Sequence, residues 1–171
     1  MGDFTLTVKD FRLPNLERIL KGLSDQSEPQ WVEAGILGGA TDEDGVSVAE
    51  YAAYNEYGAP GAGIPKRSFL RSTLSDNGDK YKRLLQGALR GLASSGASEP
   101  VGMALTAVGR EMETDVIEQI KSNMPPPNAP ETRARKEARP GGGYAGTLFD
   151  TGTMLGSVSF QLLNGSEEPY A

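Results

Sequence analysis

Two stretches of the chain alternate between apolar and polar residues, which is the pattern of half-buried strands. Over residues 30–38, one face carries Val32, Ala34 and Ile36, and the other carries Trp31, Glu33 and Leu37. Over residues 157–163, one face carries Val158, Phe160 and Leu162. A third alternating stretch, residues 4–8, predicts an edge strand. The pattern therefore predicts a small, mostly antiparallel sheet.

Helical spacing of apolar residues separates these strands. Pro14 opens one predicted helix, and Ser47 with Glu50 forms a capping box that starts a short second one, which Gly58 ends. A long helix is predicted from Ser68, broken or kinked at Asn77-Gly78. Pro100 lies in the first turn of the next helix, which Ser98 is expected to cap.

That last helix has the most regular apolar stripe in the chain. The stripe recurs every three or four residues to about Ser122, at Val101, Leu105, Val108, Met112, Val116 and Ile120. Two long helices covering a small sheet make the predicted fold class α+β. The 171 residues are expected to form a single domain.

The segment from residue 124 to residue 147 has a different composition, with five prolines, four glycines and few apolar side chains. It predicts a long exposed loop that becomes ordered only against a neighbouring subunit. After it, Asp150 is expected to cap a short turn through Leu155. Residues 164–171 are expected to form a frayed tail.

Composition narrows the possible chemistry. The chain has no cysteine and no histidine, so disulfides, thiolate sites and the commonest neutral-pH base are excluded. We expect no cofactor and no metal. The start of the chain lacks the pattern of a secretory signal, and no apolar run is long enough to span a membrane, so we expect neither export nor membrane association.

The net charge of −6 is unevenly distributed. Residues 1–58 carry 11 acidic and 4 basic residues, whereas residues 59–98 carry 2 acidic and 7 basic residues. Such asymmetry suits a protein that docks against neighbours, or against copies of itself, through complementary faces. The alternative is ordinary solvated charge.

Three short motifs resemble catalytic or ligand-binding signatures. Phe149-Asp150-Thr151-Gly152 resembles the aspartic-protease motif, but only 21 residues follow Asp150, too few for the strands and flap of that fold. The acidic run of residues 42–45 is too compact for an EF-hand loop. The glycines near residue 60 do not form a phosphate-binding loop. We therefore do not expect an enzyme.

Two groups of residues are predicted to form protein interfaces. The first is the aromatic helix and the basic segment after it, with Tyr51, Tyr54, Tyr57, Lys66, Arg67 and Arg71. The tyrosines are also compatible with packing onto the sheet, because they are amphipathic. The second group lies in the proline-rich segment and comprises Arg133, Arg135, Lys136 and Arg139. This cluster could also contact phosphates, but the chain is acidic and offers no aromatic platform there.

Three motifs in this order resemble the tail-completion and neck proteins of long-tailed bacteriophages. In that family a short helix of the form A-x-Y-x-E-x-G precedes I-P-x-R-x-F-L-R and a long helix, and the chain closes with D-T-G-x-L-x-x-S. The counterparts here are Tyr51–Gly58, Ile64–Arg71 and Asp150–Val158. The resemblance covers roughly residues 30–163. Met154 stands where leucine is usual, and the proline-rich segment is longer than in the family.

The resemblance implies a structural role in the virion, at the junction of head and tail. Such a protein forms a ring, for which six copies are expected, and contacts the connector, the tail terminator or the tail tube. DNA passes through an acidic lumen without specific binding. It would be made in the host cytoplasm and assembled into the particle. The alternatives are a phage-encoded DNA-binding accessory protein and a carboxylate-dependent hydrolase.

Overall fold

The computed structural model describes residues 30–95, 99–138 and 146–165. Its element order is β1 (Gln30–Ile36), α2 (Val48–Tyr57), the 3-10 turn η1 (Pro60–Ala62), α3 (Phe69–Ser95), α4 (Pro100–Lys121), α5 (Pro130–Glu137), α6 (Thr153–Gly156) and β2 (Val158–Asn164). The α+β class is thus confirmed. The strand predicted at residues 4–8, the helix predicted from Pro14 and the end of the tail lie outside the described residues.

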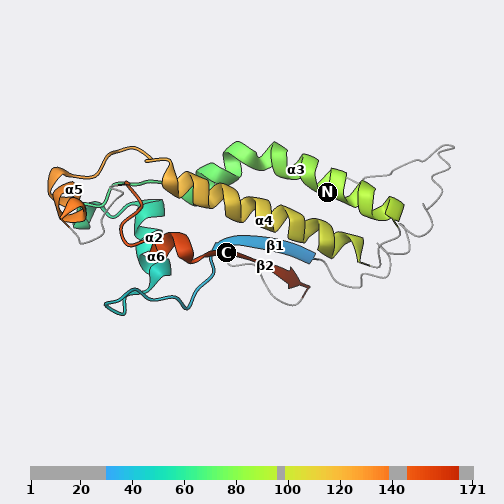
Figure 1. The fold of residues 1–171 in the computed structure, drawn as a ribbon, viewed down its shortest axis with the longest axis horizontal. Helices are drawn as coiled ribbons and strands as arrows, with labels where there is room; N and C mark the ends of the chain where they lie inside the picture. The colour runs from blue at the N-terminus through green and yellow to red at the C-terminus, as the bar shows by residue number, and fades with distance from the viewer. Residues whose placement is uncertain (1–29, 96–98, 139–145, 166–171) are drawn as a thin grey trace.

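β1 and β2 form a two-stranded antiparallel sheet. Val32 pairs with Leu162, Ala34 with Phe160, and Ile36 with Val158, so the predicted apolar faces of the two strands coincide. Figure 1 shows α3 and α4 as an antiparallel pair lying side by side, with α4 against the sheet. The smaller helices α2, α5 and α6 gather at one end of this layered structure (Figure 1).

One glycine sets how closely α4 approaches the sheet. A Cβ atom built on Gly109 would lie 2.4 Å from Cδ2 of Phe160 and 2.7 Å from Cγ2 of Val32. Both distances are far below any normal contact between carbon atoms. About two turns earlier, a Cβ on Gly102 would meet its nearest atoms at 3.6 Å, an ordinary contact. The absence of a side chain at position 109 therefore allows helix and sheet to pack.

The apolar core is concentrated where the ends of several elements meet. Its buried members are Val48, Ala52, Phe69, Val116, Ile120, Leu148, Met154 and Val158. On the predicted α4 stripe, Val108, Val116 and Ile120 are buried, while Val101, Leu105 and Met112 are only partly buried. The core therefore lies toward the C-terminal half of α4, next to α2 and α6.

A polar cluster joins α3 to α4. The carboxylate of Asp115 is 8% exposed and accepts hydrogen bonds from Nζ of Lys80, at 2.7 and 2.9 Å, and from the hydroxyl of Tyr81, at 2.8 Å. Burial, together with the bond to Asp115, raises the pKa of Tyr81 well above its ordinary value. Because Asp115 is nearly buried, these hydrogen bonds replace the hydration that its carboxylate loses.

Five expectations differ from the observed elements. The N-cap residue of α4 is Glu99, which makes no side-chain cap bond, and not Ser98. Helix α3 continues without a break through Asn77 and Gly78, where the Asn77 side chain donates to the Thr73 carbonyl. The helix also extends to Ser95, into the predicted linker. The short helix α6 begins with Gly152 as its N-cap residue, so Asp150 is not the cap. The predicted loop of residues 124–147 contains helix α5.

Candidate functional site

A buried glutamate joins two of the three motifs. Ser47 caps α2, and the helix ends at Gly58, whose φ of 81° favours glycine. Near the end of this helix the carboxylate of Glu56, 3% exposed, accepts bonds from the Ser68 hydroxyl at 2.6 Å, the Leu70 amide at 2.8 Å and Nε of Arg71 at 2.8 Å. Because Leu70 is in the first turn of α3, Glu56 caps that helix from a different element.

The pKa of Glu56 reflects two opposing effects. Burial raises the pKa, since a charged carboxylate loses hydration. The hydrogen bonds from Ser68, Arg71 and the two backbone amides together lower the pKa by more than burial raises it. The net pKa lies below the ordinary value, so the carboxylate is charged at neutral pH. Glu56 therefore acts as a structural anchor between the aromatic helix and the helix that follows it.

The three tyrosines of α2 occupy different environments. Tyr51 is partly buried and packs against the core. Tyr54 is 44% exposed and donates its hydroxyl to Glu50 at 2.6 Å, and Tyr57 is 66% exposed. The guanidinium of Arg71 lies over the ring of Tyr57, 4.5 Å from its centre. Tyr54, Tyr57 and Arg71 are thus available at the surface, whereas Tyr51 also contributes to packing.

Arg67 lies in the interior rather than on the surface. Only 5% of it is exposed, and its Nε donates to the Pro126 carbonyl at 2.9 Å while Nη2 donates to Oδ1 of Asn128 at 3.3 Å. Both acceptors are neutral, and burial lowers the pKa of the guanidinium. Arg67 therefore fixes the start of the proline-rich segment to the rest of the chain.

Lys136 fixes the other end of that segment. It is 8% exposed, and its Nζ donates to the carbonyls of Gly146 and Phe149, each at 2.7 Å. Asn128 donates to the same Gly146 carbonyl at 3.2 Å. The described parts of residues 124–147 are thus held against their own domain, unlike the exposed loop that the composition predicts.

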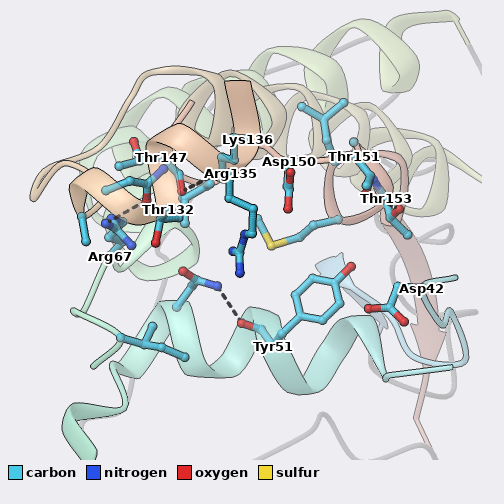
Figure 2. A pocket seen from close by; sticks show the side chains of 18 of the residues that line it. Asp42, Tyr51, Arg67, Thr132, Arg135, Lys136, Thr147, Asp150, Thr151 and Thr153 are labelled. Carbon is cyan, nitrogen blue, oxygen red and sulfur yellow. Dashed lines mark hydrogen bonds between the residues drawn. The ribbon is translucent and has the colours of Figure 1, made fainter. Parts of the chain in front are cut away.

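These elements enclose a half-open cavity of about 640 Å³. It is bounded by α2, α5 and α6 and by the turns near residues 43, 64 and 128. In Figure 2 the guanidinium of Arg135 points into its centre, with Arg67 at one end and Tyr51 and Asp42 toward the other. Asp150, from the third motif, also lines the wall. All three motifs therefore contribute residues to one cavity.

The other predicted interface residues are distributed as follows. Lys66, Arg133 and Arg135 are exposed, and Arg139 lies outside the described residues.

Within the described ranges, no group of three acidic side chains is arranged to hold a metal ion, and no helix is long and apolar enough to cross a bilayer.

Sequence reasoning missed the roles of Glu56, Asn128 and the buried Lys136. Glu56 is the acidic letter of the A-x-Y-x-E-x-G pattern, so its position within a motif was a usable signal. No pattern around Asn128 or Lys136 distinguishes them from solvated residues.

Comparison of the chain with protein-family models, with curated proteins and with solved structures found no match.

Proposed function

We propose that the protein is a structural component of a long-tailed phage particle that completes the tail, or joins it to the head, as a ring of copies. The observation that supports this proposal is the meeting of the three motifs at one end of the molecule. Glu56 and Arg71 bond directly across two of them, and Asp150 of the third lines the same cavity as Arg67. Motifs recognised separately in the sequence thus form a single structural unit.

The charged residues of this unit hold backbone in place, which suits an assembly surface. Glu56 binds the amides at the start of α3, while Arg67 and Lys136 bind carbonyls of the proline-rich segment. A buried charge used in this way orients the neighbouring loops and keeps them ready for a partner. The surrounding exposed side chains, Tyr57 and Arg71 among them, are of the types that dominate binding energy at interfaces.

Within the particle, the ring would contact the connector on one side and the tail terminator or tube on the other. An acidic lumen would let DNA pass without holding its phosphates. This role involves no reaction, and the protein would act at the head–tail junction after synthesis in the host cytoplasm.

The proposal is tested by deleting the coding sequence from the phage genome that carries it. Electron microscopy of the lysate should show DNA-filled heads and tails that remain separate, and the protein supplied from a plasmid should restore joined particles. In the same complementation assay, a plasmid encoding the Glu56→Ala variant should restore fewer joined particles than the wild-type plasmid, because the two motifs lose their shared anchor. Normal joined particles from the deletion would overturn the proposal.

A further inference from the structure

A rigid acidic turn projects beside the cavity. Oδ1 of Asp42 accepts the backbone amides of Asp44 at 3.0 Å and Val46 at 2.8 Å, and the Asp42 amide donates to the Val46 carbonyl at 2.9 Å. Gly45, with φ of 79°, closes the turn. The side chains of Glu43 and Asp44 are exposed, and Val46 is 44% exposed. The turn therefore presents two carboxylates and an apolar side chain in a fixed shape.

The sequence on both sides of this turn carries charge of one sign only. Residues 30–58 contain six acidic residues and no lysine or arginine. Like charges so close together repel, and the repulsion is relieved when a cationic surface covers them. The turn is preformed, so little conformational entropy is lost when it binds.

Arg67 at the opposite end of the cavity and Arg135 at its centre offer such cationic groups, beside Asp150, which also lines the wall. Arg67 is buried there without a carboxylate partner among the described residues, because its bonds go to a carbonyl and an amide oxygen. The guanidinium of Arg135 points into the same space, and no ion pair within the described ranges includes it. Planar guanidinium groups bind carboxylates through paired hydrogen bonds.

Within the described ranges, no ion pair joins the acidic turn to Arg67 or Arg135 of its own chain. Figure 2 places Asp42 toward the end of the cavity away from Arg67, with Tyr51 between them. The bonds within the turn hold Asp42 at that wall. A second copy of the chain can bring the same turn to the basic end from outside.

We propose that the turn of residues 42–46 in one copy inserts into the basic end of the cavity in the next copy, where Arg135 and Arg67 bind Glu43 and Asp44. The two surfaces differ, so the contact is heterologous, and repeated contacts of this kind close into a ring when the rotation allows. The inference rests on the proposed ring of copies and identifies the joint between them.

The test is a charge exchange between two full-length variants. In Arg135→Glu the cavity becomes acidic, and in the double variant Glu43→Lys with Asp44→Lys the turn becomes basic. Each variant alone brings like charges together, so its dissociation constant for self-association should rise at least about tenfold over the wild type. A mixture restores opposite charges at every joint and should assemble again, with the two variants alternating.

Sedimentation velocity and native mass spectrometry measure these outcomes at low salt and at about 0.5 M salt, where the wild-type complex should be weaker. All altered side chains are exposed, so both variants should keep the circular dichroism and melting temperature of the wild type. Arg133→Glu, an exposed change on the same helix outside the cavity lining, serves as the control for added negative charge.

Three results would overturn the inference. They are a monomeric wild type at every concentration, an Arg135→Glu variant that assembles like the wild type, and a mixture that stays dissociated. In the last case the turn does not bind in the cavity, and the arginines would instead bind an acidic segment of another virion protein or a free anion. None of these results affects the deletion experiment, so the proposed function can survive the loss of this joint.

Discussion

Replacing Gly109 with alanine tests whether α4 and the sheet are packed as closely as the structure shows. An added Cβ would lie 2.4 Å from Cδ2 of Phe160, 2.9 Å from its Cγ and 2.7 Å from Cγ2 of Val32. Relieving such contacts requires the helix to move from the sheet or the two side chains to leave their rotamers. Overpacking of this kind costs about 1–3 kcal/mol, and sometimes more.

A second effect acts in the opposite direction. In the interior of a helix, alanine is more favourable than glycine by about 1 kcal/mol. Since the contacts at position 109 involve a ring and a β-branched side chain, we expect the steric cost to be larger. With a steric cost in the upper part of its range, about 2–3 kcal/mol, and a helix gain of about 1 kcal/mol, Gly109→Ala should lower the free energy of unfolding by about 1–2 kcal/mol.

Gly87 provides the matched control on α3. A Cβ built there has no atom within 4 Å, so Gly87→Ala should gain only the helix preference and raise the free energy of unfolding by about 0.5–1 kcal/mol. Urea titrations followed by circular dichroism at low protein concentration would measure both variants. If Gly109→Ala is as stable as the wild type or more stable, the close approach of α4 to Phe160 and Val32 is wrong.

Three further substitutions test the buried polar groups. Glu56→Gln should destabilise the fold by about 1–3 kcal/mol. Because the pKa of Glu56 is lowered in the folded state, the stability of the wild type should fall more than that of the variant as the pH drops below about 4.5. Urea titrations at several pH values would measure this difference. Lys136→Met should remove the donor for two carbonyls and speed tryptic cleavage after Arg133, whereas unchanged cleavage would show that α5 is held by other contacts. Asp115→Asn should cost about 1.5–3 kcal/mol by weakening the bonds between α3 and α4, and a melting temperature equal to the wild type would contradict that estimate.

The local elements were predictable where a short pattern decides the structure. Ser47 and Glu50 specified the start of α2, and the alternation around Val32 and Phe160 specified which faces of the strands pair. Both signals depend on neighbours within a few residues, so they can be read from the sequence without knowledge of the fold.

The prediction failed where distant contacts override a local preference. Asn77-Gly78 ordinarily ends a helix, but α3 contacts α4 on both sides of this pair. Gln119 bonds to Ser72 before it and Lys80 bonds to Asp115 after it, while Asn77 bonds within the helix. Packing outweighs the cost of about 1 kcal/mol for one glycine. The composition of residues 124–147 likewise concealed α5, whose position is fixed by the bonds of Lys136 to carbonyls ten or more residues away.

The candidate site was only partly predictable for the same reason. The sequence identified Arg67 and Arg71 in one basic segment and Arg135 in another, but it indicated neither that the two segments meet at one cavity nor which of these arginines would be buried. Burial of Arg67 depends on Asn128, some sixty positions later, and no pattern links the two.

The pairing of β1 with β2 also determines when the fold can be completed during synthesis. Glu33 and Gln161 bond across the sheet although 128 positions separate them. The α3–α4 hairpin joins neighbouring segments and can form early, but the sheet must wait until the ribosome has delivered residues 158–164. Until then, α4 at Gly109 has no Phe160 to pack against. A nascent chain stalled before that point would expose an apolar helical face, and chaperones or proteases would encounter that face first.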